Sequence, residues 1–317
     1  MTTGTFILSL DCEGKWGMAD SLTADHHRWL TTANLRAAYA QLLDLFDEYG
    51  IASTFAFVMA FLLSDREQRD CDHLFQDQEI DGANWLRAFR AAQRDGGLEG
   101  WCMPELLDAV QARGRHEIGC HGFSHLPLGE DMVSEAVMRR EIAAAVAVAE
   151  RRALQLDTFI YPRNIVGYPH ALADAGFMAY RDGSGGGGGP VKKARNLLSE
   201  LNVGDRPQQP ARAGGPVTVI PSGHFFNWRR GVRRLVPPAV TARRWSAMLE
   251  RSAREGGVVH LWLHPHNIIS APGTLEVLRS VLRHVARLRD AAGITVATQR
   301  DFGADALATR ESDNDEP

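Results

Sequence analysis

Residues 5–14, TFILSLDCEG, carry the pattern that decides the fold, because a short apolar run ends in two carboxylates. Thr5 to Leu10 has the length and composition of a buried strand. Asp11 and Glu13 follow it, and alternate residues of an extended segment share one face, so both carboxylates can point into one site. The alternative is a strand end whose carboxylates face solvent or a salt bridge. No positively charged stretch precedes the run, so we expect a core strand and not a signal peptide.

Strand-like and helix-like segments alternate along the rest of the chain. Further strands are expected at 51–58, 116–120, 158–161, 177–180, 217–220, 258–263 and 294–297. Helices are expected at 33–49, 104–113, 134–154, 169–175 and 274–290, the longest of which repeat apolar residues at helix spacing. This order favours a parallel α/β fold, either a barrel or an open doubly wound sheet. The absence of GxGxxG after the first strand and of GxxxxGK[ST] disfavours dinucleotide and P-loop sites.

The composition is that of an ordinary globular protein. Of the 317 residues, 44% are hydrophobic and 23% are charged, which excludes wholesale disorder. A net charge of -4 disfavours nucleic acid as a partner. The 4 cysteines form no CxxC, which suits a reducing compartment. No stretch approaches the roughly 20 apolar residues of a membrane span. We therefore expect a cytoplasmic protein without a transmembrane segment.

Three segments depart from the strand–helix pattern. We expect one domain over residues 1–302, with insertions at about 63–103 and 184–257. The first insertion is charged and contains tryptophan, and the second opens with the glycines 185–189, a composition typical of a mobile loop. Residues 303–317 end in carboxylates and are expected to form an acidic, disordered tail.

Four polar clusters each come directly after a predicted strand. They are DCE at 11–13, HGFSH at 121–125, PRN at 162–164 and HPH at 264–266. In α/β folds the loops after the strands meet at one face, and that face carries the site. Histidines four apart lie on one face of a helical turn and, with a carboxylate, supply the three N or O ligands usual for a catalytic zinc. Most isolated HxxxH pairs are nevertheless chance surface pairs.

Single residues in these clusters have their own alternatives. His264 ends a predicted strand, where a histidine can protonate a leaving amine. His260, deeper in the same strand, is expected to be buried and hydrogen-bonded, and His266 to be a loop histidine. Arg163 could hold an ionised aspartate by a bidentate contact, or it could lie on the surface beside a proline turn. Cys12 could be a soft metal ligand, although a small core residue is the commoner role of a free cysteine.

An arginine-rich segment with three aromatic residues begins at Phe225. It could bind a phosphorylated or nucleotide-bearing substrate, or an anionic membrane surface. The interpretation that we prefer is a charged helix surface or an oligomer contact.

Together, the four clusters resemble the polysaccharide deacetylase superfamily, the NodB-homology or carbohydrate esterase family 4 enzymes. The motifs that carry the resemblance are SLDCEG at 9–14, HGFSH at 121–125, YPRN at 161–164 and LWLH at 261–264. Their order and spacing match over roughly residues 5–300. The resemblance implies an α/β fold that is a single distorted (β/α)7 barrel with long loop insertions. It also implies one divalent metal, zinc first, with cobalt, nickel or manganese as alternatives.

By this resemblance, Asp11 matches the general base, His264 the general acid and Arg163 the arginine that orients the base. The metal is expected on Glu13, His121 and His125. Cys12 stands where the family usually has a second aspartate, so it stays open as the third ligand in place of Glu13. The residues expected to bind substrate are Trp262, Trp228, Asn164, Arg229 and Arg230.

The activity implied is removal of an N-acetyl or similar acyl group by a metal-dependent amidohydrolase, with a water on the metal as nucleophile. The expected substrate is an intracellular N-acylated amino sugar, free or attached to a nucleotide or lipid carrier. Two alternatives stay open. One is a deformylase or another C–N amidohydrolase that uses the same residues. The other is a catalytically dead barrel that binds carbohydrate or acts as a scaffold, and Cys12 is its best support.

Overall fold

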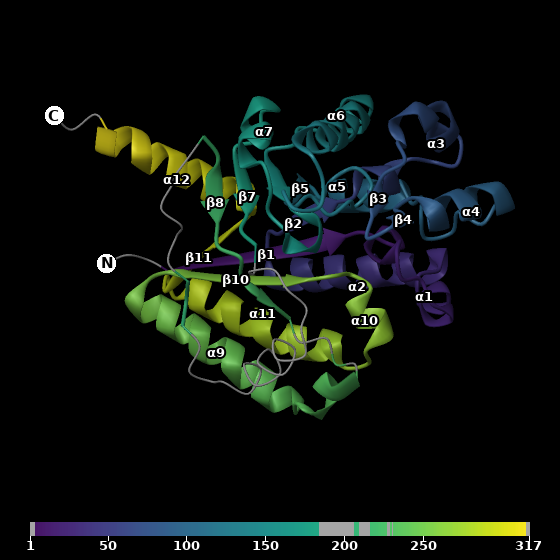
Figure 1. Cartoon of the computed structure of the whole chain (residues 1–317). Helices are drawn as coiled ribbons and strands as arrows, with labels where there is room; N and C mark the ends of the chain where they lie inside the picture. Colours follow the sequence, from purple (N-terminus) through teal and green to yellow (C-terminus); the bar gives the residue numbers. More distant parts are fainter. Residues whose placement is uncertain (1–3, 184–205, 209–215, 227–228, 230, 315–317) are drawn as a thin grey trace.

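A curled parallel sheet forms the centre of the molecule (Figure 1). The computed structural model describes residues 4–183, 206–208, 216–226, 229 and 231–314. The strands of the sheet are β1 (Gly4–Cys12), β2 (Thr54–Phe57), β5 (Glu117–Cys120), β6 (Thr158–Ile160), β7 (Ala179–Arg181), β8 (Thr218–Ile220), β9 (His224–Phe225), β10 (Val258–Leu263) and β11 (Ile294–Ala297). Their order is β8-β7-β6-β5-β2-β1-β10-β9, with β11 also paired to β1. This curled sheet with its outer helices confirms the predicted distorted barrel.

Strand β1 lies at the centre of the sheet and has three partners. One edge pairs with β10 from Thr5 to Leu10. The other edge is divided, because its first half pairs with β11 and its second half pairs with β2. All but one of the strand's residues are buried, as expected of a parallel strand covered on both faces. The divided edge brings β11, the last of the described strands, next to β1.

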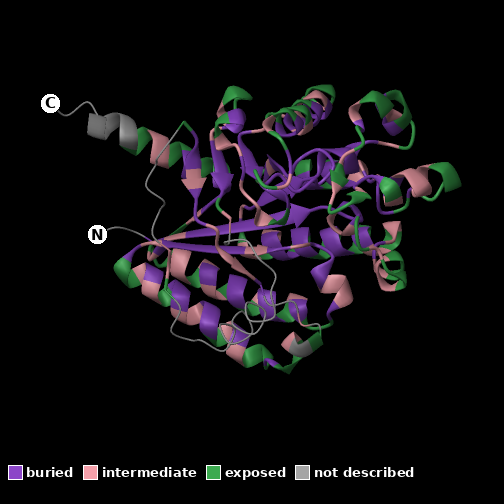
Figure 2. Cartoon of the chain, viewed as in Figure 1, coloured by how far each residue is buried: buried purple, intermediate pink, exposed green. Residues whose placement is uncertain are grey.

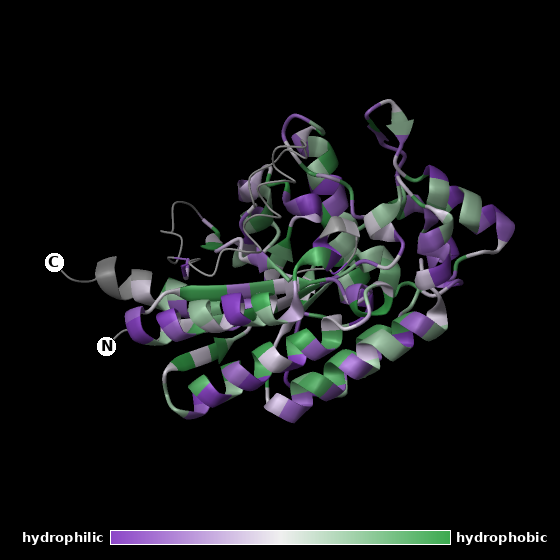
Figure 3. Ribbon diagram, turned by 90° about the horizontal axis from the view of Figure 1, so that it is seen from below, coloured by the Kyte–Doolittle hydropathy of each residue, from purple (hydrophilic) through white to green (hydrophobic). Residues whose placement is uncertain are grey.

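The helices cover the outside of the sheet, with buried residues on the sides that face it (Figure 2). Helices α2, α11 and α9 pack side by side. Figure 3, turned to show this side, has hydrophobic and hydrophilic residues alternating around them, as one buried face requires. No described helix is long and apolar enough to cross a membrane. The α-helices are α1 (Ala24–Trp29), α2 (Thr32–Tyr49), α3 (Glu67–Asp70), α4 (Arg87–Asp95), α5 (Glu105–Gln111), α6 (Glu135–Arg151), α7 (Pro169–Asp174), α9 (Pro238–Glu255), α10 (Asn267–Ser270), α11 (Thr274–Asp290) and α12 (Gln299–Asn314), and the short 3-10 turns are η1 (Trp16–Met18), η2 (Met59–Leu62), η3 (Asp72–Leu74), η4 (Pro162–Asn164) and η5 (Gly231–Leu235).

The predicted insertion at 63–103 packs against the barrel. It contains α3, α4 and the hairpin of β3 (Glu79–Ile80) with β4 (Ala83–Asn84). Phe89 packs against Trp16, with ring centroids 4.6 Å apart. The Trp85 indole donates a hydrogen bond of 2.9 Å to the carbonyl of Ser124. The insertion therefore supports the loop that carries the HxxxH motif.

The predicted insertion at 184–257 is not an insertion throughout. Its later part supplies β8, β9 and α9, which belong to the barrel wall. Helix α9 buries Trp245, Met248 and Leu249, which are spaced for one helical face. The glycines 185–189 lie outside the described residues.

The predicted disordered tail at 303–317 is wrong for residues 303–314, which continue α12. The helix starts with a reciprocal cap, because Thr298 Oγ1 accepts from the backbone N–H of Asp301 and the Asp301 carboxylate accepts from the backbone N–H of Thr298, both at 3.1 Å. Phe302 is buried against the sheet. Carboxylates in the following sequence do not prevent a helix that is nucleated by such a cap.

Candidate metal centre

Residues from all four polar clusters line one cavity beyond the carboxyl ends of β1, β5 and β10. The cavity has a volume of about 340 Å³. It is also lined by Phe225 of β9, which begins the arginine-rich segment, and by His26 and Trp29 of α1, which sequence reasoning had not singled out. The predicted site residues that line it are Asp11, Glu13, His121, His125, Arg163, Asn164, Trp262 and His264.

Glu13, His121 and His125 form a buried cluster. Glu13 Oε2 lies 3.0 Å from His125 Nε2 and 3.6 Å from His121 Nε2. His121 Nδ1 is 2.8 Å from the carbonyl of Ile160, so Nδ1 carries the proton and the lone pair of Nε2 faces the carboxylate. An acceptor that faces an acceptor in a buried site needs a cation or a proton between them. Ligand atoms on a tetrahedral zinc with bonds of roughly 2.0–2.1 Å are about 3.3 Å apart, so the spacing fits a metal.

The loop of the HxxxH motif is not the helical turn that we expected. Residues 121–128 contain no helix, and His125 has a left-handed φ of 60°. The two imidazoles still meet, with ring centroids 4.8 Å apart. The carboxylate of Glu141, on α6, holds the loop by accepting hydrogen bonds from Ser124 N at 3.0 Å and from Ser124 Oγ at 2.9 Å. Tertiary contacts, not helix periodicity, bring the histidines together.

Cys12 points away from the cavity and lies in the hydrophobic core beside Tyr39. Burial raises the pKa of its thiol well above the usual value, which opposes the thiolate that a metal would require. Among the described residues, the groups that could hold a metal include Glu13 and not Cys12. The structure therefore favours Glu13 as the third ligand.

Asp11 is held by Arg181, which reaches it from β7 across the barrel interior. Arg181 Nη1 donates to Asp11 Oδ1 at 2.8 Å, and Nη2 donates to Asp11 Oδ2 at 2.7 Å. The guanidinium also donates to Asn164 Oδ1 at 2.7 Å and lies 4.6 Å from the Trp262 ring centroid. Burial alone would raise the pKa of Asp11, yet the charge of Arg181, helped by nearby histidines, lowers it below its usual value. Asp11 is thus ionised at neutral pH.

Arg163, predicted to orient Asp11, does not contact it. Its Nη2 lies 2.6 Å from Asp20 Oδ1, and its guanidinium lies 5.2 Å from the Trp85 ring at the rim of the cavity. The cause is local, because Arg163 sits in a tight turn with φ 57° that turns its side chain away from Asp11. Arg181 is the residue that sequence reasoning missed. It directly follows the predicted strand 177–180, so the rule that found the other clusters would have found it too.

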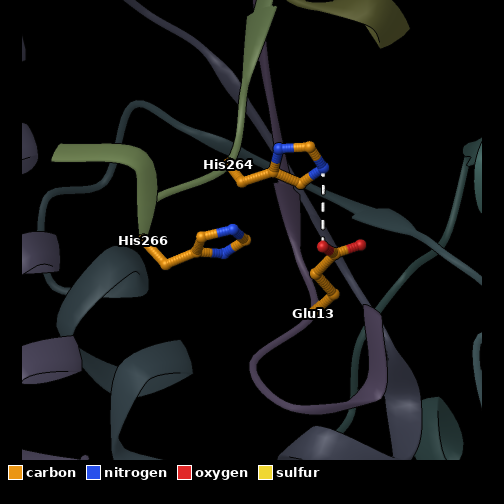
Figure 4. Close-up of side chains that lie close together, drawn as sticks. All are labelled: Glu13, His264 and His266. Atoms are coloured by element: carbon orange, nitrogen blue, oxygen red, sulfur yellow. Dashed lines mark ion pairs between the residues drawn. The ribbon is translucent and has the colours of Figure 1, made fainter. Parts of the chain in front are cut away.

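His264 lies beside the other carboxylate oxygen of Glu13. Its Nε2 is 3.5 Å from Glu13 Oε1, and its Nδ1 is 3.2 Å from Asn267 Oδ1. His266 stacks beside it, with ring centroids 5.0 Å apart (Figure 4). His260 is buried as predicted, between Ser9 Oγ and the carbonyl of Pro221, each 2.8 Å away.

The predicted substrate contact of Arg229 is not supported. Arg229 donates to the carbonyls of Val236 at 2.6 Å and Arg234 at 3.3 Å, and it does not line the cavity. Its guanidinium therefore stabilises the local loop and does not face a ligand. Trp228 and Arg230 lie outside the described residues. Trp262 and Asn164 do line the cavity.

Sequence comparison identifies the part of the chain that carries the HxxxH loop. Residues 21–164 match the family described as "Polysaccharide deacetylase". Over this segment the chain resembles the polysaccharide deacetylases. The resemblance inferred from the four motifs is thereby confirmed, although Asp11, Glu13 and His264 of the deacetylase-like site lie outside the matched segment. No curated protein sequence gives a significant match.

Solved structures share the fold over nearly the whole chain. A Mycobacterium smegmatis protein assigned to the polysaccharide deacetylases superimposes with a TM-score of 0.61 at 18% identity, covering 98% of this chain and 92% of that one. One from Pseudomonas aeruginosa PAO1 has a TM-score of 0.59 at 16% identity, with coverages of 99% and 92%. PuuE allantoinase has a TM-score of 0.59 at 16% identity, with coverages of 96% and 90%. Identities this low show a shared fold, not a shared substrate.

Proposed function

We propose that this protein is a metal-dependent amidohydrolase that removes an N-acetyl or similar acyl group from an amino sugar. The observation that carries the proposal is the cavity that joins Asp11, held by Arg181, to the buried cluster of Glu13, His121 and His125. The match of residues 21–164 to a family of deacetylases supports the same reaction.

Glu13, His121 and His125 would hold the divalent cation, and two imidazoles with one carboxylate suit zinc. When bound, such a cation polarises the acyl carbonyl and makes a water molecule more acidic. Burial of all three side chains keeps bulk water from competing for these positions.

Asp11 is the group that accepts the proton of the attacking water. Its carboxylate is ionised and oriented before substrate arrives, because Arg181 occupies both of its oxygens. A charge that is already oriented needs no reorganisation during the reaction. Such electrostatic preorganisation is usually the largest single contribution to catalysis. Arg181 acts through Asp11 and is therefore a positioning residue.

His264 is the group that returns a proton to the leaving amine. Asn267 fixes the ring through Nδ1, so Nε2 faces the cavity. The aromatic rings of Trp262 and Phe225 stand beside it, with centroids 4.7 Å apart, and offer an apolar wall to a sugar ring.

The test is acyl release from a panel of N-acetyl and N-formyl amino sugars by the zinc-loaded protein, with His125→Ala as the metal-deficient control. We expect acetate or formate from at least one sugar and none from the control. The identity of the acid released separates a deacetylase from a deformylase. A zinc-loaded protein that binds sugars and releases neither acid would establish the dead-barrel alternative instead.

A further inference from the structure

We propose that Glu13, His264 and His266 form a second, weaker divalent-cation site, which inhibits hydrolysis when it is filled. The inhibition rests on the proposed function, because it acts through His264. The cation site itself rests on geometry alone.

The two carboxylate oxygens of Glu13 face different histidines. Oε2 faces His121 and His125, whereas Oε1 faces His264 Nε2 at 3.5 Å (Figure 4). A separation of 3.5 Å is too long for a good N–H···O hydrogen bond, which is roughly 2.7–3.2 Å. It is close to the separation of about 3.3 Å between two ligand atoms on one tetrahedral zinc. Glu13 is therefore placed to give one oxygen to each of two cations.

His266 completes the second set of ligands. One ligand atom from each of Glu13, His264 and His266 lies within 4.8 Å of the other two. The rings of His264 and His266 are stacked, with an interplanar angle of 26°, and Figure 4 shows the His266 ring beside the pair of Glu13 and His264. Pro265 joins the two histidines and restricts the loop that carries them. The His-Pro-His sequence thus presents two imidazoles to one carboxylate oxygen.

The second site must be the weaker one. Its only anionic ligand is a carboxylate that it shares with the first site, and two nearby dications repel each other. Asp11 does not compensate, because the charge of Arg181 already neutralises it. The ions therefore bind in order, first at His121 and His125 and then at His264 and His266.

Occupation of the second site removes the proton donor. A cation on His264 Nε2 takes the lone pair that would otherwise carry the proton to the leaving amine. Loss of a general acid costs roughly a hundredfold or more in rate. We expect activity to rise with the first equivalent of zinc and to fall by about that factor as the second binds.

The experiment combines a zinc count with an activity titration. Bound zinc is measured by equilibrium dialysis for wild type, His266→Gln and the surface control His170→Gln, whose imidazole pairs with Glu135 instead. We expect two ions on wild type and His170→Gln, and one on His266→Gln. We expect His266→Gln to keep its activity at zinc concentrations that inhibit the other two. Circular dichroism establishes that each variant is folded.

Two results would overturn the inference. One is a wild-type protein that binds a single ion at saturating zinc. The other is inhibition of His266→Gln to the same extent as wild type. A protein that binds two ions but hydrolyses no substrate would refute the proposed function and leave the second site standing. Binding of cobalt, followed by its visible absorption, gives the same count without any assay of activity.

Discussion

Asp11 and Arg181 form the contact on which the proposed chemistry depends most directly. Asp11→Asn keeps the size of the side chain and removes the proton acceptor. We expect the variant to retain bound metal and to lose at least about a hundredfold in turnover, as removal of a general base does. Metal analysis beside a turnover assay checks both parts. Near wild-type turnover would exclude Asp11 as the base.

Arg181 has a matched control in Arg163, the arginine at the cavity rim. Arg181→Met leaves the Asp11 carboxylate buried without its cation, so the pKa of Asp11 rises. The base must be ionised to work, so the acid limb of the pH profile of kcat/KM shifts to higher pH. Arg163→Met should leave that limb in place. Equal shifts in both variants would show that Arg181 has no special relation to the base.

The sequence was sufficient for the residues that follow local rules. Alternation along the first strand placed Asp11 and Glu13 together and Cys12 on the opposite side. The same rule could have found Arg181 as a site residue, but it could not predict the contact with Asp11, which lies 170 positions away. That contact depends on how strongly the sheet curls, because β7 is separated from β1 by β6, β5 and β2. No local pattern encodes that curvature.

Helix α6 positions the HxxxH loop through one side chain, Glu141. Glu141→Ala removes the acceptor for both Ser124 hydrogen bonds. Loss of such supporting partners typically weakens metal binding about 10- to 100-fold, and we expect about tenfold here. Glu135→Ala, on the same helix but with an exposed carboxylate, is the control and should bind normally. Competition with a chromogenic zinc chelator measures both. A zinc affinity of Glu141→Ala equal to that of wild type would show that the loop keeps its conformation without Glu141.

His116, directly before β5, has a lowered pKa that makes the folded state less stable in acid. Burial lowers the pKa of His116 to about 4, and its ring packs against Phe55 with centroids 5.1 Å apart. A lowered pKa in the folded state gives stability that is complete above about pH 6.5 and lost as pH falls toward about 4. His116→Gln should therefore show a flatter decline in unfolding free energy over this range, by less than about 1.4 kcal/mol per pH unit. Urea unfolding at several pH values tests this, and parallel curves would contradict it.

Helices and strands were predictable from the sequence where apolar residues recur at regular spacing. They were harder to predict where charged residues flank the apolar ones. The helix ending at Gly50 was predicted from its apolar spacing, and Gly50 has the left-handed φ of 61° of a C-cap. Helix α9 was missed because its buried stripe is narrow and flanked by arginines, which looked like an exposed insertion. Helix α12 was missed because its acidic end outweighed the cap at Thr298.

At the scale of the whole molecule, the first turn of α12 closes the end of the barrel opposite the cavity. It packs against the starts of β2 and β5. The backbone N–H of Arg300 donates to the buried carboxylate of Glu117 at 2.9 Å, and that of Gln299 donates to Thr54 Oγ1 at 2.9 Å. Phe302 adds a buried ring. Residues 304–309 contain no buried side chain.

Two truncations separate these contributions. A chain that ends at Gly303 keeps the seal and should unfold within a few degrees of the full protein. A chain that ends at Ala297 loses the buried ring and both donors, which should cost about 3–6 kcal/mol. Thermal unfolding followed by circular dichroism checks both. Equal melting temperatures for the two truncated chains would show that α12 does not stabilise the barrel.

The divided edge of β1 also matters while a ribosome is making the chain. β1 is made before the other strands of its sheet, and β2 can join one edge early, but β10 and β11 follow only from residue 258 and residue 294. Until then the other edge of an apolar strand stays open, which is a hazard for association between nascent chains. Asp11 and Glu13 at the end of this strand put charge on the exposed segment during that interval. The same two carboxylates thus serve the chain before there is any cavity for them to line.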